Sequence, residues 1–548
     1  MMPKLFFLAA LLVIAGCSKA PDSGPLPAPN AAAPAPPASA AARAVPAAGS
    51  GTAEGVAAVA WQKGDVDAAF AMAKEANKPV FLYWGAVWCP PCNQVKATIF
   101  NRQDFIERSR FFVPVYLDGD SRSAQRQGAR FKVGGYPTMI LFTPDGTEIT
   151  RLPGEVDADQ YMRVLAMGMN GARPVKTMLA AALGPRKGAD AKLSPEDWRM
   201  LAYYSWDTDE QQLIAKKDVA PTLRRLAQAC PADQPATATR LKLKAIAAAA
   251  AAKDAKPHDD KAAREEVTKA LADATLTREN FDLLTYAAAD IAGHVALPKS
   301  AERAALVAAW DGVLQRLAAD ASLSALDRLS AVGARIDLAR LDVPKGALPE
   351  PLLASVREHV ARGEKETVDP YARETVINAA AHVLADAGLL DESDALLQAE
   401  LSRSATPYYF MLGLAANAKK RGDKAGAVDW AEKAYAAASG PATRLQWGAT
   451  YVNMLVELTP DDAARIERAA GQVIGELEPV PDTFYDRNRR SLERMARNLA
   501  GWNKAKQQRD ALQRIRAQLA GVCTRLPAGD PARATCDGVW NPAKAAAA

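Results

Sequence analysis

The first folded stretch combines one amphipathic segment with short apolar runs. From Asp65 to Asn77, apolar side chains recur at helical spacing, which predicts a helix with one buried face. Three later runs, rich in β-branched and aromatic residues, predict strands. They cover Val80–Trp84, Phe111–Leu117 and Met139–Phe142. Strands that alternate with helices are typical of a sheet covered by helices.

After residue 173 the strand pattern ends, and signals for helix starts recur up to residue 540. Ser194–Asp197 and Thr459–Asp462 each predict an N-cap followed by proline in the first turn. Alanine supplies much of the apolar content of the whole chain, and aromatic residues are only 7%. Both facts favour closely packed helices over a β-sandwich for this second part.

A period of 34 residues is visible inside the helical part. Gly388 and Pro407 recur 34 positions later as Gly422 and Pro441. Each block has the order helix, glycine-containing turn, helix, and then a proline before the next pair. The stretch Thr375–Leu458 therefore resembles tetratricopeptide repeats, which have this period. A helical bundle without repeats is the alternative.

The N-terminal pattern is that of an export signal. Lys4 precedes an apolar run, Leu5–Ala15, that is too short to span a bilayer. The run ends in Ile14–Cys17, which resembles the lipobox of bacterial lipoproteins and implies cleavage before Cys17 and lipidation of that cysteine. An ordinary cleaved signal peptide is the alternative. In such lipoproteins Ser18 implies sorting to the outer membrane, so we expect a periplasmic, lipid-anchored protein of a Gram-negative bacterium.

Residues 17–58 consist almost wholly of Pro, Ala, Gly and Ser. A segment of this composition cannot bury enough apolar surface to offset the entropy lost on ordering. The sequence therefore predicts a disordered tether that lets the folded part reach away from the membrane surface.

Composition and charge exclude several classes of function. Hydrophobic residues make up 49% of the 548 residues and charged residues 24%, so the chain as a whole is not disordered. The net charge of +5 is dispersed, which disfavours a nucleic-acid partner. We expect no metal held by histidines, because the four histidines show no recurring ligand spacing: they are His258, His294, His359 and His382. No cofactor is expected either, because the cysteine pair described next can itself carry electrons.

The expected export allows the six cysteines to form disulfides, because the compartment outside the cytoplasm is oxidising. Cys89 and Cys92 stand in the sequence Trp88-Cys89-Pro90-Pro91-Cys92, between a predicted strand and a predicted helix. Unpaired backbone N–H groups and the dipole at a helix N-terminus stabilise a thiolate. We therefore expect Cys89 to be the nucleophile and Cys92, one turn later, to resolve the mixed disulfide. Half of a zinc site is the alternative, but no second pair follows at ligand spacing.

A second motif, Val133–Thr138, precedes the strand at 139–142 and contains Tyr136-Pro137. Together with the Trp-Cys-Pro-Pro-Cys sequence, it resembles the cis-proline loop of thioredoxin-like proteins. The stretch Trp61–Asn170 is similar to a thioredoxin-like domain of the kind found at the C-terminus of DsbD-type electron transporters.

The resemblance implies site roles. Cys89 and Cys92 would form the redox disulfide, with Trp88 as a shield beside it. Tyr136 and Pro137 would lie on the edge that docks the substrate backbone. The implied partners are protein thiol or disulfide substrates and a membrane electron donor, and the dithiol itself carries the electrons.

One position departs from the family pattern. Many members carry a buried carboxylate six residues before the first cysteine, where it helps the resolving thiol to lose its proton. Position 83 is a tyrosine here. Glu75, Asp118 or a water are the alternatives for that role. We therefore expect slow release of a Cys89 mixed disulfide at neutral pH.

Three cysteines lie outside these motifs. Cys523 and Cys536 flank a loop that contains Pro and Gly, and in an exported protein they predict a structural disulfide. A second redox centre is the alternative. Cys230 is then left over, as a buried inert thiol or as a partner in an intermolecular disulfide.

The sequence thus predicts an α/β thioredoxin-like fold followed by an all-α, tetratricopeptide-like domain. The expected function is thiol–disulfide exchange in the cell envelope, in the direction of reduction or isomerisation. The alternative is a scaffold or adaptor lipoprotein whose helices bind partners and whose thioredoxin fold is not catalytic. The expected divisions are a signal peptide at 1–16, a tether at 17–58, the redox domain at 59–172, helical hairpins at 173–370, repeats and C-terminal helices at 371–540 and a tail at 541–548.

Overall fold

The computed structural model describes residues 58–540, except 64, 122, 153, 155, 172, 185–191, 211 and 504–506. The predicted signal peptide, the lipidation site Cys17, nearly all of the tether and the tail at 541–548 lie outside the described residues. Among the described helices, none is long and apolar enough to cross a membrane.

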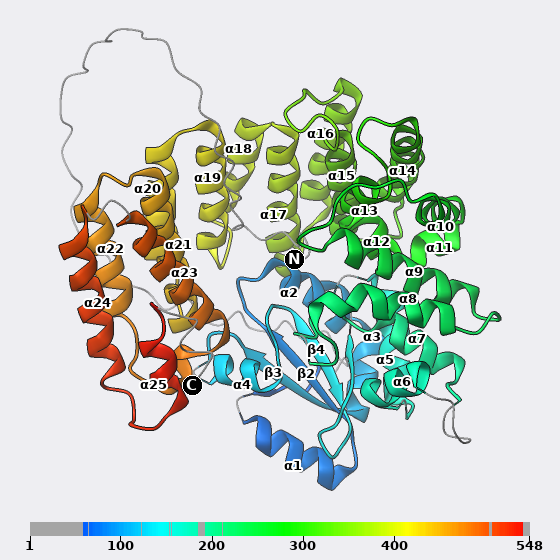
Figure 1. Ribbon diagram of the computed structural model, residues 1–548, viewed down its shortest axis with the longest axis horizontal. Helices are drawn as coiled ribbons and strands as arrows, with labels where there is room; N and C mark the ends of the chain where they lie inside the picture. Colours follow the sequence, from blue (N-terminus) through cyan, green and yellow to red (C-terminus); the bar gives the residue numbers. More distant parts are fainter. Residues whose placement is uncertain are drawn as a thin grey trace.

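A five-stranded mixed sheet forms the first part, in the order β1-β3-β2-β4-β5 (Figure 1). β1, β3 and β2 are parallel to one another. β4 runs antiparallel to β2, and β5 runs antiparallel to β4. The central strand β2 is buried along its whole length because helices cover both faces of the sheet. The strands are β1 (Gln62–Lys63), β2 (Val80–Gly85), β3 (Val113–Asp118), β4 (Thr138–Phe142) and β5 (Glu148–Leu152).

The helices around the sheet follow from local signals in the sequence. The Asp65 side chain caps α1 by accepting from the N–H of Ala68, and Asn77 ends the helix with a φ of 50°. A 3₁₀ turn at Ser109–Phe111 delays β3 by two residues relative to the predicted strand. These helices are α1 (Val66–Ala76), α2 (Pro90–Val95) with a π-helical continuation (Lys96–Phe100), α3 (Gln103–Arg108), α4 (Ala124–Arg130) and α5 (Ala158–Met169).

Within the described residues, everything after α5 is helical or loop, as the sequence predicts. The helices are α6 (Val175–Leu183), α7 (Pro195–Tyr203), α8 (Val219–Ala229), α9 (Pro235–Ala250), α10 (Lys261–Ala272), α11 (Ala274–Glu279), α12 (Phe281–Tyr286), α13 (Ala288–Val295), α14 (Ala301–Ala319), α15 (Ala325–Ala339), α16 (Glu350–Glu366), α17 (Pro370–Ala387), α18 (Leu390–Glu400), α19 (Pro407–Arg421), α20 (Lys424–Ala437), α21 (Pro441–Leu458), α22 (Ala463–Gly475), α23 (Asp486–Trp502), α24 (Arg509–Cys523) and α25 (Pro531–Asp537). Short 3₁₀ turns at Lys216–Asp218 and Pro481–Phe484 precede α8 and α23.

Glycines end two of these helices where the 34-residue period places them. Gly388 after α17 and Gly422 after α19 have φ values of 89° and 84°, a conformation that favours glycine. The predicted helix start at Thr459 is wrong, because Thr459 is the C-cap of α21. The N-cap of α22 is Asp462, whose carboxylate accepts from the N–H of Arg465.

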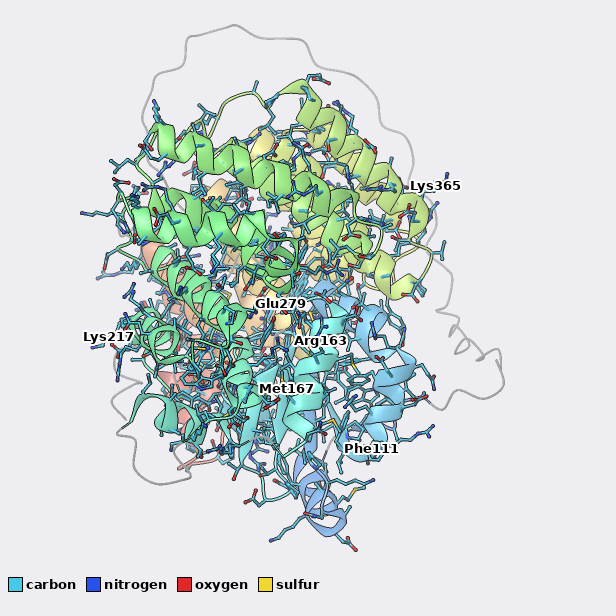
Figure 2. The ribbon with its side chains drawn as sticks, turned by 90° about the vertical axis from the view of Figure 1, so that its right-hand side faces the viewer. Phe111, Arg163, Met167, Lys217, Glu279 and Lys365 are labelled. Atoms are coloured by element: carbon cyan, nitrogen blue, oxygen red, sulfur yellow. A yellow bond between two sulfur atoms is a disulfide. The ribbon has the colours of Figure 1, made fainter. Side chains whose placement is uncertain are left out.

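The helices form an arc around the sheet (Figure 1). α6–α9 lie on one flank, α17 passes over α2, and α21–α25 come down on the other flank. The side view in Figure 2 places Lys365 on the arc and Phe111 on the sheet part at opposite ends. One continuous buried cluster joins sheet residues such as Ile140 to Leu241 of α9 and Trp447 of α21.

The three remaining cysteines lie in this helical part. Cys523 at the end of α24 forms a disulfide with Cys536 in α25, with the Cα atoms 5.6 Å apart. Cys230 is a free, half-buried thiol just after α8. Burial and the charge of Asp233 raise the pKa of the Cys230 thiol to about 11, so it is protonated and unreactive at neutral pH.

Candidate active site

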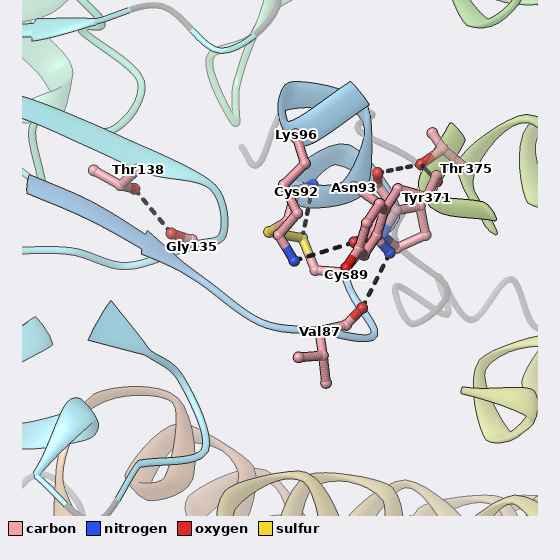
Figure 3. The surroundings of a disulfide bond; sticks show 10 residues. Val87, Cys89, Cys92, Asn93, Lys96, Gly135, Thr138, Tyr371 and Thr375 are labelled. Carbon is pink, nitrogen blue, oxygen red and sulfur yellow. Dashed lines mark hydrogen bonds between the residues drawn. A yellow bond between two sulfur atoms is a disulfide. The ribbon is translucent and has the colours of Figure 1, made fainter. Parts of the chain in front are cut away.

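Cys89 and Cys92 form a disulfide at the start of α2, with their Cα atoms 5.2 Å apart (Figure 3). Cys89 is the N-cap of α2, and the N–H of Cys92 donates to its Sγ at 3.2 Å. Pro90 and Pro91 occupy the first turn of α2. N–H groups in a first turn make no hydrogen bond within the helix, so the two prolines remove none. The Cys92 N–H would stabilise a Cys89 thiolate after reduction.

Two loops hold the disulfide in place (Figure 3). The Asn93 side chain donates to the Val87 carbonyl at 3.0 Å, which fastens the loop between β2 and α2. The Tyr136–Pro137 peptide bond is cis, and the Thr138 hydroxyl closes that loop on the Gly135 carbonyl at 2.8 Å. Figure 3 shows this second loop pointing at the disulfide.

The expected docking residues come together beside the cysteines. Trp88 and Tyr136 meet edge to face, with ring centroids 5.8 Å apart. The Tyr136 hydroxyl accepts from the Gln125 side chain at 3.0 Å. Trp88 is 5% exposed and Tyr136 3% exposed, while Pro137 is half-buried.

Tyr83 occupies the position of the missing carboxylate and stacks on Tyr116, with ring centroids 5.2 Å apart. Burial raises the pKa of both phenols, so neither carries a charge at neutral pH. The buried Tyr83 hydroxyl has no hydrogen-bond partner among the described residues. This tyrosine pair therefore cannot accept a proton from Cys92 near pH 7.

Lys96 lies one helical turn after Cys92 on the same face (Figure 3). Burial lowers the pKa of its ammonium group, and the charge of Asp118 opposes that shift. Asp118 ends β3 opposite Gly85, near the active-site loop. Glu75, the other expected substitute, is exposed on α1, which Figure 1 places at the far end of the sheet from α2.

Aromatic side chains of the arc cover Trp88. Tyr409 of α19 stacks on it with ring centroids 5.8 Å apart, and Trp447 of α21 meets it edge to face at 4.6 Å. The Trp447 indole N–H donates to the Tyr408 carbonyl at 3.2 Å, which fixes the ring. An aromatic group next to the disulfide is therefore packed against the arc rather than presented to solvent.

α23 places charged groups over Tyr136, another of the expected docking residues. The Arg487 guanidinium lies over the Tyr136 ring at 4.6 Å. The backbone N–H of Arg487 donates to the side-chain oxygen of Gln125 at 3.2 Å. Arg490 donates to the Gly134 carbonyl at 2.8 Å, in the cis-proline loop. The arc thus supplies hydrogen-bond donors to the loop that is expected to dock a substrate.

α17 and α15 cover the other side of the dithiol helix. The Thr375 hydroxyl donates to the Pro90 carbonyl at 2.5 Å, and the Gln94 side chain donates to the Ser324 hydroxyl at 3.1 Å. Cys89 is 2% exposed and Cys92 fully buried. In this arrangement a folded protein cannot reach either sulfur.

The structure brings together the residues that the sequence proposes for the site: the two cysteines, Trp88, Tyr136 and Pro137. The residues of the cover were not expected from the sequence. Each covering contact joins positions hundreds of residues apart, and no local pattern signals it. Tyr408–Phe410 form an aromatic run in the sequence, but nothing in that run indicates that Tyr409 meets Trp88. In the described residues, no group of three or more His, Cys, Asp or Glu side chains is arranged to hold a metal ion.

A mixed sheet of this order, with a Cys-x-x-Cys disulfide capping a helix next to a cis-proline, defines a thioredoxin-like redox fold. A family model described as a thioredoxin-like domain matches residues 66–168. Rice H-type thioredoxin (Oryza sativa subsp. indica) is 32% identical over 101 residues, which are 18% of this chain and 78% of that protein. Through this segment the chain belongs to the thioredoxin family, and it is homologous to thiol–disulfide oxidoreductases.

Two further relatives are partial matches. Thiol:disulfide interchange protein DsbD 1 of Pseudomonas aeruginosa is 30% identical over 106 residues. The chain spans only 18% of the length of that relative, and the match covers 18% of this chain. A solved structure of the DsbH oxidoreductase aligns with 21% of this chain and 89% of its own, at 20% identity and a TM-score of 0.20. That score is too low to support a conclusion.

Proposed function

We propose that this protein is a thiol–disulfide oxidoreductase of the cell envelope that acts on protein substrates. The observation that carries the proposal is the position of Cys89 as N-cap of the dithiol helix, where the Cys92 N–H meets its sulfur at 3.2 Å. That N–H stabilises a Cys89 thiolate, the form that attacks a disulfide.

The exchange has two steps. The reduced Cys89 thiolate attacks a substrate disulfide, so that a Cys89–substrate bond forms and one substrate sulfur leaves as a thiolate. The Cys92 thiolate then attacks Cys89, which releases the second substrate thiol and leaves the Cys89–Cys92 disulfide. A membrane electron donor returns two electrons to that disulfide. Reduction or isomerisation of substrates is the proposed direction, and Trp88, Tyr136 and Pro137 would dock them.

Access to the sulfurs requires the arc to move. Aromatic packing over Trp88 leaves Cys89 only 2% exposed. We infer that α19, α21 and α23 swing away from the docking residues before a protein substrate binds.

The proposed location is the periplasm, with Cys17 lipidated in the outer membrane after removal of residues 1–16. The tether at 17–58 would hold the redox domain at 59–172 away from the bilayer. This part of the proposal rests on the lipobox-like sequence Ile14–Cys17.

Trapping tests the activity. In a Cys92→Ser variant of the full chain, Cys89 can attack a substrate but the mixed disulfide cannot be resolved. We expect discrete mixed disulfides with envelope proteins on non-reducing gels, which reducing agent removes. Cys89→Ser/Cys92→Ser is the matched control and should trap nothing.

The covered docking edge favours a second candidate function. If the arc never leaves Trp88, the protein is a scaffold or adaptor whose helices bind partners and whose disulfide is structural. Absence of mixed disulfides in Cys92→Ser, together with wild-type behaviour of Cys89→Ser cells, would establish this alternative and exclude the enzyme.

A further inference from the structure

A cavity of about 330 Å³ separates the dithiol helix from the arc, at the low end of the volumes of ligand sites. Pro90 and Pro91 form one wall, next to the cysteines. α15 and α17 form the opposite wall, with Asp327 and Asn378 among its residues. Residues from the arc, and not only from the thioredoxin fold, therefore border the redox site here.

Asn378 is the first sign that the cavity is built for an occupant. Its side chain is 1% exposed, and neither the amide nitrogen nor the amide oxygen has a hydrogen-bond partner in the described part of the chain. Buried amides are normally paired, and an unpaired one is unfavourable. A side-chain amide offers a donor and an acceptor together, which matches the C=O and N–H of a peptide backbone.

The carboxylates of the cavity give the second sign. Both guanidinium groups of the cavity are shared with carboxylates outside it. Arg102 pairs with Asp159 at 2.9 Å and also with Asp104, while Arg278 lies 3.5 Å from Asp157 and 3.1 Å from Asp320. The Asp327 carboxylate accepts from the Ser324 hydroxyl at 2.7 Å and from the Ser324 backbone N–H, both uncharged donors.

No cationic side chain pairs with Asp327 among the described residues. Among the residues that line the cavity, the three carboxylates of Asp157, Asp159 and Asp327 face only two guanidinium groups, which they share with other carboxylates, so negative charge is in excess. A cationic group from outside the chain would complete the site.

The cavity is within reach of a substrate bound at Cys89. Gln94 follows Cys89 by five residues, which at 1.5 Å per residue is roughly 7.5 Å along the helix. Gln94 bonds Ser324, which bonds Asp327. Asp327 therefore lies further from Cys89 than Gln94 does. Three residues of extended chain span about 10 Å, and the side chain of a lysine at that position extends further toward Asp327.

We propose that this cavity is a specificity site, which binds an extended peptide segment through Asn378 and a lysine or arginine of that segment through Asp327. The segment is the part of the substrate that flanks its reactive cysteine. The proposal rests on the thiol–disulfide exchange proposed above and names the class of substrate for it.

Synthetic peptides with one cysteine, held as a mixed disulfide with thionitrobenzoate, test the proposal on the reduced full chain. Each peptide carries lysine or glutamine at the third position before or after the cysteine. Attack of Cys89 on the peptide sulfur releases coloured thionitrobenzoate. We expect the better lysine peptide to react about fivefold faster than its glutamine twin, and Asp327→Asn to reduce that preference below twofold.

Asp159→Asn is the matched control, because that carboxylate already has a partner in Arg102. It should keep the preference. Equal rates for lysine and glutamine peptides in the wild type, or a preference that survives Asp327→Asn, would refute the cavity proposal alone. No release of thionitrobenzoate from any peptide would instead refute the proposed exchange.

A second variant separates recognition of the backbone from folding. Asn378→Leu replaces the unpaired amide by an apolar group of similar size, so the folded protein should be at least as stable as the wild type. Titration of the oxidised full chain with peptides whose cysteine is replaced by serine should show weaker binding of lysine and glutamine peptides alike. Unchanged binding by this variant would contradict the role of Asn378.

Discussion

Lys96 is the nearest charged group on the face of the dithiol helix that carries Cys92. The stacked Tyr83 and Tyr116 rings are neutral at pH 7 and cannot assist the resolving thiol. After reduction, an ammonium group one turn from Cys92 would favour the thiolate form over the thiol. The ammonium group itself donates to the Asn93 side chain at 3.3 Å. We expect its charge to compensate in part for the carboxylate that position 83 lacks.

Lys96→Met tests this role. Without the ammonium charge, the pKa of the Cys92 thiol should rise, and release of a Cys89 mixed disulfide at pH 7 should slow about three- to tenfold. The pH at which release is half-maximal should shift upward, and stopped-flow measurements of release against pH would show both changes.

Lys74→Met, an exposed lysine on α1, is the control and should leave the profile unchanged. A lowered maximal rate without a shift of the pH profile would mean that Lys96 acts only through packing.

Asp327 gives the lysine preference a pH dependence. Burial and the charge of Asp157 raise the pKa of this carboxyl to about 6, although the Ser324 hydroxyl and Arg278 oppose the shift. The carboxylate that binds lysine therefore exists above pH 6 and is lost as the pH falls through that value. We expect the ratio of lysine to glutamine peptide rates to approach one at pH 5, and a constant ratio from pH 5 to 8 would exclude Asp327.

At the scale of elements, α1, β2, β3 and β4 were predictable because their signals are local. Asp65 and Asn77 mark the ends of α1, and an apolar run of five residues marks β2. The helix start predicted at Thr459 was wrong because Asp462, three residues later, is an equally suitable N-cap and is the one that caps α22. The cover over Trp88 was not predictable, because it depends on how the arc curves and not on any single helix.

Trp447 of α21 makes the closer of the two aromatic contacts by which the arc covers Trp88, with ring centroids 4.6 Å apart. Trp447→Leu should loosen α21 over Trp88 and raise the rate at which dithiothreitol reduces Cys89–Cys92 about tenfold. Reduction can be followed by alkylation of the released thiols in the full chain.

Trp430→Leu is the matched control, since this half-exposed tryptophan of α20 lies under Lys433 and away from the docking residues. Equal acceleration by both variants would indicate general destabilisation. No acceleration by Trp447→Leu would show that the arc does not limit access.

At the scale of the molecule, the sheet and the arc share one buried cluster, which contains Ile140, Leu241 and Trp447. Residues that share a core lose their packing together. The redox part and the flanking helices should therefore unfold in one cooperative transition.

Leu241→Ala in α9 removes a fully buried side chain from that cluster. It should lower the free energy of unfolding by about 2–5 kcal/mol, and protection of the sheet amides should fall with it. Hydrogen exchange of β2 and β4 in guanidinium would report this change.

Leu455→Ala, in the separate cluster of α20–α24, is the control and should affect the sheet less. If Leu241→Ala leaves the hydrogen-exchange protection of the sheet amides unchanged, the redox part folds independently of the flanking helices.

The cover over the cysteines also bears on chemical damage. A solvent-accessible thiolate is oxidised by peroxide to sulfenic acid and then, irreversibly, to sulfinic acid. With Cys89 only 2% exposed beneath Trp88, the reduced protein would keep hydrogen peroxide away from its nucleophile between turnovers. The closed arc would then protect the reduced thiol from oxidation, and Cys89 would become reactive only while the arc is open.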